Sequence, residues 1–297
     1  TALSLAAEHR DIAAAIFVIV RSRRAQFVSA VVIPERAVIG NVGEKRGPGQ
    51  LCAGGDAAPA VAFVAYHGPR MPEGVPMLRG EAGEVTLPGD VLAYDARTGE
   101  HLWRFNVIPE PGEFGHETWE NDAWRFSGDL STWAPAAADP ELGLVYLVTN
   151  ASTVQSYTGH RPGHNLFGGS VLALDVRTGE RRWHFQIAHH GVWDYDLPTA
   201  PVLATVRTDA GVRDVVVQLT KQGFAFVFDR VSGEPIWPIE ERPVPQSDIP
   251  GERLAPTQPF PTKPAPFSRL TFTEADVNPY LDEAERARII NILRTSR

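Results

Sequence analysis

The sequence predicts an all-β protein made of stacked sheets, a β-propeller, and three observations lead to this fold class. The 297 residues include 26 glycines and 25 prolines, and the strongest apolar segments are short and rich in valine and phenylalanine. This composition favours many strands and turns over helices. One segment occurs three times, and its spacing is typical of propeller blades of about 40 to 50 residues. A sandwich with similar hairpins is the alternative, but a repeat of this length indicates stacked units.

The three copies of the repeat are the most informative feature of the chain. They span Gly89–Trp103, Gly169–Trp183 and Gly223–Trp237, and each keeps Asp, Thr or Ser, Gly, Glu and Trp at identical offsets. We expect each copy to form a hairpin whose Asp caps the turn and whose Gly supplies a positive φ. The final Trp is expected to pack on the neighbouring unit. The longer first interval implies an insertion, for which the aromatic and acidic stretch Pro109 to Trp133 is the candidate.

Residues 1–88 carry weaker signals, and we treat them as a divergent N-terminal segment of uncertain fold ahead of the blades at 89–297. The pattern favours a helix over Ala2–Ala15 and strands over Phe27–Ile33 and Ala60–Tyr66. The apolar run Ile12–Val20 is too short to span a bilayer and is expected to be a buried helix or strand. No phosphate loop or dinucleotide fingerprint occurs in this segment.

Two aspartates and a lysine between Ile187 and Asp229 predict a reactive centre. Asp194 and Asp196 alternate with two aromatic residues, so an extended segment would place both carboxylates on one face and both rings on the other. Two apolar runs follow, separated by a tight turn that holds Lys221 at its tip. Alone, Asp194 would be interpreted as a capping acid and Lys221 as an exposed turn lysine. Their combination favours a site.

The C-terminal part is interpreted as a surface loop followed by a helix. Pro238 to Pro266 is proline-rich and is expected to be an extended loop bound along a surface rather than a set of strands. Thr273 and Asp276 have the spacing of a capping box, and Leu281 to Leu293 has helical apolar spacing.

Charge and cysteine usage exclude several classes of protein. A net charge of −8 argues against nucleic acid as a partner. Cys52 is the single cysteine, which excludes an internal disulfide and a cysteine-based zinc site. His189 and His190 are adjacent, and adjacent residues on a strand face opposite ways, so we interpret them as structural or rim residues rather than a metal pair.

The repeats, written Asp-x-x-Thr-Gly-Glu-x-x-x-Trp, resemble the tryptophan-docking motif of the pyrroloquinoline quinone (PQQ) dehydrogenases. Segments similar to the membrane-type quinoprotein glucose dehydrogenase branch are HHGVWDYDLP, TKQGFAFVFDRVSGEPIWPIEERPVPQSDIPGE and PTQPFPTKPAPF. The resemblance runs from about Gly89 to the end and is most specific over Trp183 to Phe267. It implies an eight-bladed propeller. Because the repeats account for about three to four blades, we expect a partial propeller from a fragment or a truncated gene product.

The resemblance also implies roles for individual residues. Asp194, the first acid of WDYD, falls at the position of the catalytic base. Lys221 falls at the position of the lysine that contacts the quinone oxygens, and Trp133 at that of the tryptophan forming the floor under the cofactor. Thr153 matches a metal-side position more loosely. Asn150 lies one residue out of register with an asparagine often found nearby.

These residue types suit the chemistry that the resemblance implies. PQQ is a flat, acidic tricycle, so an indole face gives it a wide contact and a lysine offsets its charge. A carboxylate can take the hydroxyl proton of a sugar or alcohol substrate. The resemblance further implies a Ca2+ or Mg2+ ion, ubiquinone or a cytochrome c as electron acceptor, and a place in the periplasm or on the periplasmic face of the inner membrane. We expect no signal peptide or transmembrane helix in the chain itself.

A second interpretation is a non-catalytic β-propeller scaffold for protein–protein binding in the periplasm. The propeller lipoprotein that helps assemble outer-membrane proteins resembles this repeat too. The discriminating feature is the combination of Asp194, Lys221 and Trp133, which a scaffold has no reason to keep together. The paired adjacent cysteines of the methanol and ethanol branch are absent from the sequence.

Overall fold

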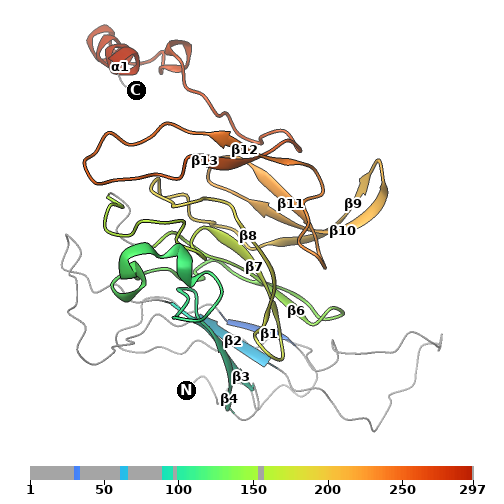
Figure 1. Cartoon of the computed structure of the whole chain (residues 1–297). Helices are drawn as coiled ribbons and strands as arrows, with labels where there is room; N and C mark the ends of the chain where they lie inside the picture. Colours follow the sequence, from blue (N-terminus) through green and yellow to red (C-terminus); the bar gives the residue numbers. More distant parts are fainter. Residues whose placement is uncertain (1–29, 34–60, 66–88, 96–98, 153–156, 296–297) are drawn as a thin grey trace, which may run out of the picture.

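The structure, a computed structural model, describes residues 30–33, 61–65, 89–95, 99–152 and 157–295 (Figure 1). The strands expected near positions 30 and 63 are present as β1 (Ala30–Ile33) and β2 (Val61–Ala65). The helix expected over Ala2–Ala15 and the buried segment expected over Ile12–Val20 lie outside the described residues.

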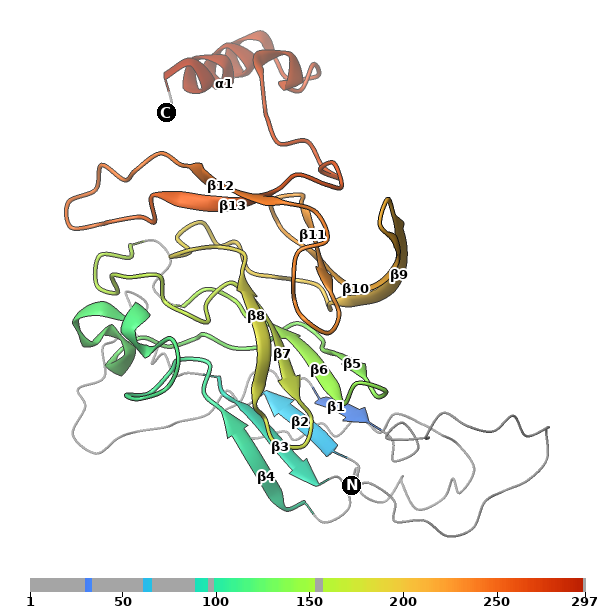
Figure 2. The same cartoon turned by 45° about the vertical axis from the view of Figure 1, so that its right-hand side comes forward.

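The described strands form antiparallel sheets that follow one another along the chain (Figures 1 and 2). Blade 1 is the sheet β1–β2–β3–β4, blade 2 is β5–β6–β7–β8 and blade 3 is β9–β10–β11, while β12 and β13 form a separate ribbon. Within each sheet, strands consecutive in sequence pair with each other, as they do in propeller blades. The remaining strands are β3 (Val91–Asp95), β4 (His101–Phe105), β5 (Ala137–Asp139), β6 (Leu144–Val148), β7 (Ser170–Asp175), β8 (Arg181–Gln186), β9 (Val202–Thr208), β10 (Gly211–Leu219), β11 (Ala225–Asp229), β12 (Ile239–Pro243) and β13 (Thr257–Pro261).

The repeated turn is closed by the bonds that its residue types predict. In blade 2 the N–H of Asp175 donates to the carbonyl of Glu180 at 2.8 Å, and the N–H of Gly179 donates to the carbonyl of Asp175 at 2.9 Å. The Asp175 carboxylate accepts the N–H groups of Arg177 and Thr178, so it caps the turn. The three turn glycines all have positive φ, 75° at Gly99, 74° at Gly179 and 75° at Gly233.

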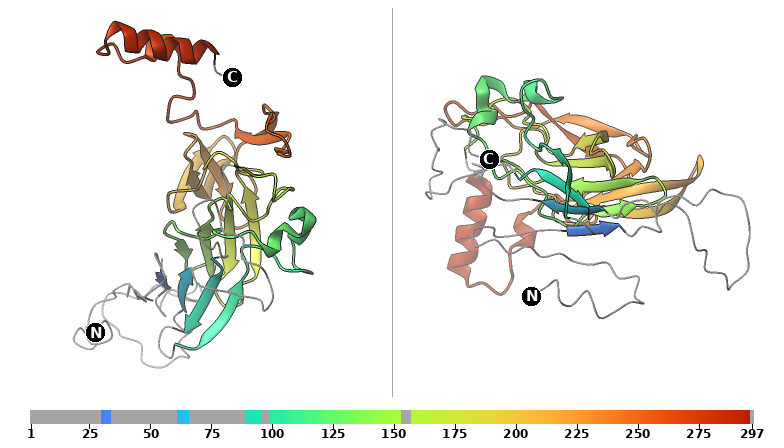
Figure 3. Two further views of the ribbon diagram at one scale, coloured as in Figure 1. Left: turned by 90° about the vertical axis from the view of Figure 1, so that its left-hand side faces the viewer. Right: turned by 90° about the horizontal axis from the view of Figure 1, so that it is seen from below.

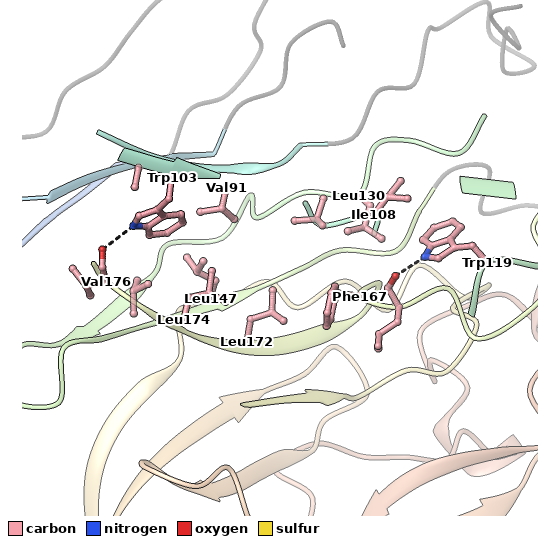
Figure 4. Packing of buried hydrophobic residues seen from close by; sticks show 14 of the residues in the cluster. Val91, Trp103, Ile108, Trp119, Leu130, Leu147, Phe167, Leu172, Leu174 and Val176 are labelled. Carbon is pink, nitrogen blue, oxygen red and sulfur yellow. Dashed lines mark hydrogen bonds between the residues drawn. The ribbon is translucent and has the colours of Figure 1, made fainter. Parts of the chain in front are cut away.

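Blade 2 is buried on both faces, and this creates two cores. Alternate residues of β7 point to opposite sides of the sheet. On one side Leu172 packs with Val91 and Trp103 of blade 1 (Figure 4). On the other side Val171 packs with Phe228 of blade 3. Burial of both faces explains why β6 and β7 are continuous apolar runs without alternation.

The repeat tryptophans join one blade to the next. The Trp103 indole N–H donates to the carbonyl of Val176, just beyond β7, at 2.9 Å. A Cβ atom built on Gly179 would lie 2.5 Å from the same indole, so the ring rests directly on the turn glycine of blade 2. Trp183 repeats the contact, donating to the carbonyl of Arg230 in blade 3 at 3.3 Å. The predicted packing on neighbouring units is confirmed for these two tryptophans and stays a prediction for the third.

The expected insertion leaves blade 1 and returns at blade 2. Pro109 to Trp133 contains two short 3-10 helices, η2 (His116–Thr118) and η3 (Glu120–Arg125). Trp119 lies between them, is 3% exposed, and donates its indole N–H to the carbonyl of Leu166 (Figure 4). Its burial fixes the insertion against the part of the chain that precedes β7.

The prediction that Pro238 to Pro266 is a loop rather than a set of strands is wrong, because β12 and β13 pair there as an antiparallel ribbon. The N–H of Thr262 donates to the carbonyl of Pro238 at 3.0 Å, which marks a hydrogen-bonded pair. Hydrogen-bonded and non-hydrogen-bonded pairs alternate along such a ladder, so Pro259 and Pro261 fall in non-hydrogen-bonded pairs. An N–H there would point away from the partner strand, and proline removes no ladder bond.

The chain ends in a helix that stands apart from the sheets (Figure 3). The predicted capping box is present, with the side chains of Thr273 and Asp276 each bound to the other residue's backbone around a short 3-10 helix, η4 (Glu274–Asp276). The predicted terminal helix is α1 (Glu283–Thr295), none of whose residues is buried. Within the described ranges, no helix combines the length and apolar character needed to span a membrane.

Candidate active site

The β10–β11 hairpin presents Lys221 at its tip. Beyond the last paired residues, the N–H of Thr220 donates to the carbonyl of Phe224 at 3.0 Å, and the N–H of Gly223 donates to the carbonyl of Thr220 at 3.1 Å. Gly223 has a φ of 85°, which glycine adopts without steric cost. The expected tight turn with Lys221 at its tip is therefore confirmed.

The Lys221 ammonium binds both acids of the WDYD motif. Its Nζ atom donates to the Oδ2 atoms of Asp194 and Asp196, each at 3.2 Å, and to the main-chain carbonyl of Asp194 at 2.9 Å. The structure thus brings together the acid pair and the lysine that the sequence predicts as a reactive centre.

The segment carrying the acids is irregular, whereas the sequence-based geometry assumed an extended strand. Residues 191–201 contain no strand, and Asp194 has a φ of 57° in the left-handed region. Such a φ costs a residue with a side chain about 1 kcal/mol or more, so neighbouring contacts must hold it. The rings of Trp193 and Tyr195 stack on each other, with their centroids 5.8 Å apart. The carboxylates of Asp194 and Asp196 both bind the ammonium of Lys221.

The two carboxylates lie in different environments. The Asp194 side chain is 64% exposed and that of Asp196 is 14% exposed. Asp196 also accepts the N–H of Ala151 at 3.1 Å. Burial raises the pKa of Asp196 above its ordinary value, although the Ala151 N–H and the ammonium act in the opposite direction. Partial burial works against the charged form of Lys221, but the two carboxylates outweigh it and raise the pKa of the lysine.

Trp133 belongs to a segment that backbone bonds tie to the same region. The residue is 41% exposed. Two residues earlier, the N–H of Ser131 donates to the side-chain oxygen of Asn150 at 2.6 Å, and the N–H of Asn150 donates back to the Ser131 carbonyl at 3.2 Å. The residue after Asn150 donates its N–H to Asp196. A shared ligand between Trp133 and the lysine stays a prediction.

A family profile described as "PQQ: Glucose/ethanol/alcohol dehydrogenase, beta-propeller domain" matches residues 77–296. The chain belongs to this family. The match begins before the first repeat and ends within the last residues of the chain. It confirms the β-propeller fold class and covers β3 and β4 of blade 1 and all strands of blades 2 and 3.

Individual PQQ dehydrogenases align with part of the chain. It is 38% identical over 174 residues to quinoprotein glucose dehydrogenase of Escherichia coli, covering 58% of this chain and 21% of the relative. It is 40% identical over 177 residues to the glycerol dehydrogenase large subunit of Gluconobacter oxydans, covering 59% and 23%. The chain therefore spans only about a fifth to a quarter of the length of these curated relatives. Quinohemoprotein alcohol dehydrogenase from Comamonas testosteroni is a structural neighbour with TM-score 0.48 and 29% identity, covering 59% of this chain and 28% of that one.

A PQQ dehydrogenase must hold a planar acidic cofactor, and membership of the family implies PQQ for this chain. Lys221 has a side chain that is 33% exposed and Trp133 is 41% exposed, and an ammonium and an indole are the donor and the flat apolar surface that such a molecule needs. For a divalent ion, the described residues include no group of three or more His, Cys, Asp or Glu side chains placed to bind it. Thr153, the predicted metal-side residue, lies outside the described residues.

Two buried side chains, His190 and Arg161, support the segment that carries the acids, and sequence reasoning did not assign this position to either of them. His190 is 2% exposed, and its ring binds the carbonyl of Gly163 at 2.6 Å and the hydroxyl of Thr158 at 2.8 Å. This agrees with its predicted structural role but places it beside the WDYD turn. Arg161 is 1% exposed and donates to the carbonyl of Gly191. An arginine ahead of a Pro-Gly pair has no pattern that indicates burial, so no sequence signal was available.

Proposed function

We propose that the chain is the catalytic part of a PQQ-dependent dehydrogenase that oxidises a hydroxyl group of a sugar or alcohol. The observation that carries this proposal is the Lys221 ammonium held between two aspartates of unequal exposure at the end of blade 3. The names of relatives, which include glucose and glycerol dehydrogenases, support a polyhydroxylated substrate.

Asp194 is the base in this proposal. Oxidation of a hydroxyl to a carbonyl releases one proton and one hydride, and PQQ, when bound, supplies the acceptor for the hydride. Asp194 takes the proton at its carboxylate, which solvent and substrate can reach because the side chain is 64% exposed. The bond from Lys221 to Oδ2 orients this carboxylate and leaves Oδ1 available.

Asp196 and Lys221 prepare the site for the acidic cofactor. The Ala151 N–H fixes the carboxylate of Asp196, whose Oδ2 atom lies 3.2 Å from Nζ of Lys221. Asp196 therefore holds the ammonium in place at the tip of the β10–β11 hairpin. The ammonium would bind the carbonyl oxygens of PQQ, and the Trp133 ring would cover its flat face. Calcium or magnesium near Thr153 belongs to the proposal, but no step is assigned to the ion. The electron acceptor, ubiquinone or a cytochrome c, and the periplasmic location are likewise proposed from the family resemblance.

The decisive experiment is reconstitution of the full chain with PQQ and calcium. Binding is followed by the quinone absorbance that stays with the protein after gel filtration, and turnover by dye reduction with glucose and with ethanol. Retained quinone together with substrate-dependent dye reduction is the expected result. A chain that neither retains the quinone nor reduces the dye would contradict the proposal and favour the non-catalytic scaffold.

A further inference from the structure

Arg161 is a buried cation whose hydrogen bonds are made to neutral groups. It is 1% exposed, and its guanidinium donates to the side-chain oxygen of Asn165 at 2.7 Å and to the carbonyl of Gly191 at 2.6 Å. Its Nε atom has no partner among the described residues. Burial lowers the pKa of Arg161 to about 10, against an attraction from Glu252, so the group is still charged at neutral pH. Burying such a charge without a bonded acid is costly, and packing alone does not require it.

The carbonyl that Arg161 holds lies in the turn leading to the proposed base. Gly191 precedes Asp194 by three residues, and both His190 and Asp194 have left-handed backbone angles, φ 48° and 57°. His190 is bound at both ring nitrogens, to the Gly163 carbonyl and the Thr158 hydroxyl. A backbone with two such residues persists only where surrounding bonds determine it, and the guanidinium provides one of them.

The segment that carries Arg161 is itself anchored, so it can act as a fixed support. The N–H of Thr158 donates to one oxygen of Glu252 at 2.9 Å, and the hydroxyl oxygen of Thr158 lies 3.1 Å from the same carboxylate oxygen. The other oxygen of Glu252 accepts the hydroxyl of Ser247 at 2.5 Å. Glu252 and Ser247 both lie in the long connection between β12 and β13. The connection therefore braces the 158–165 segment through Thr158.

We propose that Arg161 is a positioning residue that holds the Gly191 carbonyl and thereby sets Asp194 against Lys221. The inference rests on the proposed function of Asp194 as the base. The planar guanidinium directs two N–H groups at Asn165 and Gly191 at once. A lysine would keep the charge but has no such fixed fork.

The test compares the full chain with its Arg161→Met and Arg161→Lys variants by hydrogen exchange read out by mass spectrometry. In Arg161→Met we expect the amides of residues 187–196 to exchange about 10- to 100-fold faster, the range expected for loss of a charge-assisted hydrogen bond. Amides in β7 and β8 should keep their rates. Arg161→Lys should show a smaller acceleration confined to the same residues. Arg253→Met removes an arginine that is 73% exposed and serves as the matched control.

Two exchange results would overturn the proposal. One is an unchanged exchange rate for the amides of residues 187–196 in Arg161→Met. If the methionine variant does not fold, the same result in Arg161→Lys would overturn the proposal. The other is an acceleration spread evenly over all three blades, which would make Arg161 a residue of general stability. After reconstitution with PQQ and calcium, kcat should fall in parallel while KM changes little. If the parent chain has no activity, the proposed function fails, whereas the exchange pattern still decides whether Arg161 positions this turn.

Discussion

The ammonium of Lys221 lies 3.2 Å from the Oδ2 atom of Asp194, although the two residues are 27 positions apart. The same ammonium binds the main-chain carbonyl of Asp194 at 2.9 Å, so both the backbone and the carboxylate of this residue are fixed. The two side chains are 33% and 64% exposed. An ion pair that accessible contributes only about 0 to 1 kcal/mol to stability. Stability alone therefore does not account for this geometry, which is compatible with the proposed roles of the two residues in binding and proton transfer.

Replacement of Asp194 by asparagine tests the proton-accepting role. The amide has nearly the same shape and can still accept the Lys221 bond through its oxygen, but it cannot take a proton. We expect kcat in dye reduction to fall about 100- to 10,000-fold, with PQQ affinity largely unchanged. Asp209→Asn, in the exposed turn between β9 and β10, is the control. A parallel loss of PQQ affinity would contradict the assigned role.

Replacement of Lys221 by alanine tests the cofactor contact. Loss of a charge-assisted donor is expected to weaken PQQ binding about 10- to 100-fold, measured by titrating the quinone into the purified chain with calcium present. Lys263→Ala removes an exposed lysine from the segment after β13 and should bind PQQ like the parent. Equal affinity in the Lys221 variant and the parent would remove this residue from the site.

The repeated turns were predictable because the information that forms them is local. An Asp four residues before a Gly determines the cap and the positive φ, and both occur as expected at Asp175 and Gly179. The β12–β13 ribbon was not predictable in the same way. Whether Pro259 removes a hydrogen bond depends on the row of the ladder in which it falls, and the register with the partner strand decides that.

The candidate site likewise has one part that could be predicted from the sequence and another part that could not. Asp194 lies in the segment before β9 and Lys221 in the turn between β10 and β11, so their meeting follows from one hairpin and the segment that leads into its blade. The shielding of Asp196 depends on the N–H of Ala151, and the support behind the turn depends on Arg161, which only tertiary packing buries. No alternation or spacing in the sequence marks contacts between segments of this kind.

A matched pair of glycines tests the docking of Trp103. Gly179 and Gly99 have the same backbone angle, φ 74° and 75°, but a Cβ on Gly179 would lie 2.5 Å from the Trp103 ring. A Cβ on Gly99 would meet no described atom within 4 Å. Both alanine variants incur the cost of the left-handed angle, about 1–2 kcal/mol. Gly179→Ala should lose about 1–3 kcal/mol more because the indole must shift. Equal losses in urea denaturation would contradict tight docking.

The stability of the chain should fall as the pH drops from about 6.5 to about 4, through buried histidines. Burial lowers the pKa of His190 from its ordinary value of 6.5 to about 4, and burial does the same for His184. Between these values the unfolded chain binds protons that the folded chain excludes, so acidification favours unfolding by about 1.4 kcal/mol per pKa unit and histidine. His190→Gln should therefore lower the slope of unfolding free energy against pH in this window, measured by urea denaturation. The exposed His101, replaced in the same way, is the control for the substitution itself. A parental slope in His190→Gln would show that this imidazole is not held neutral by the fold.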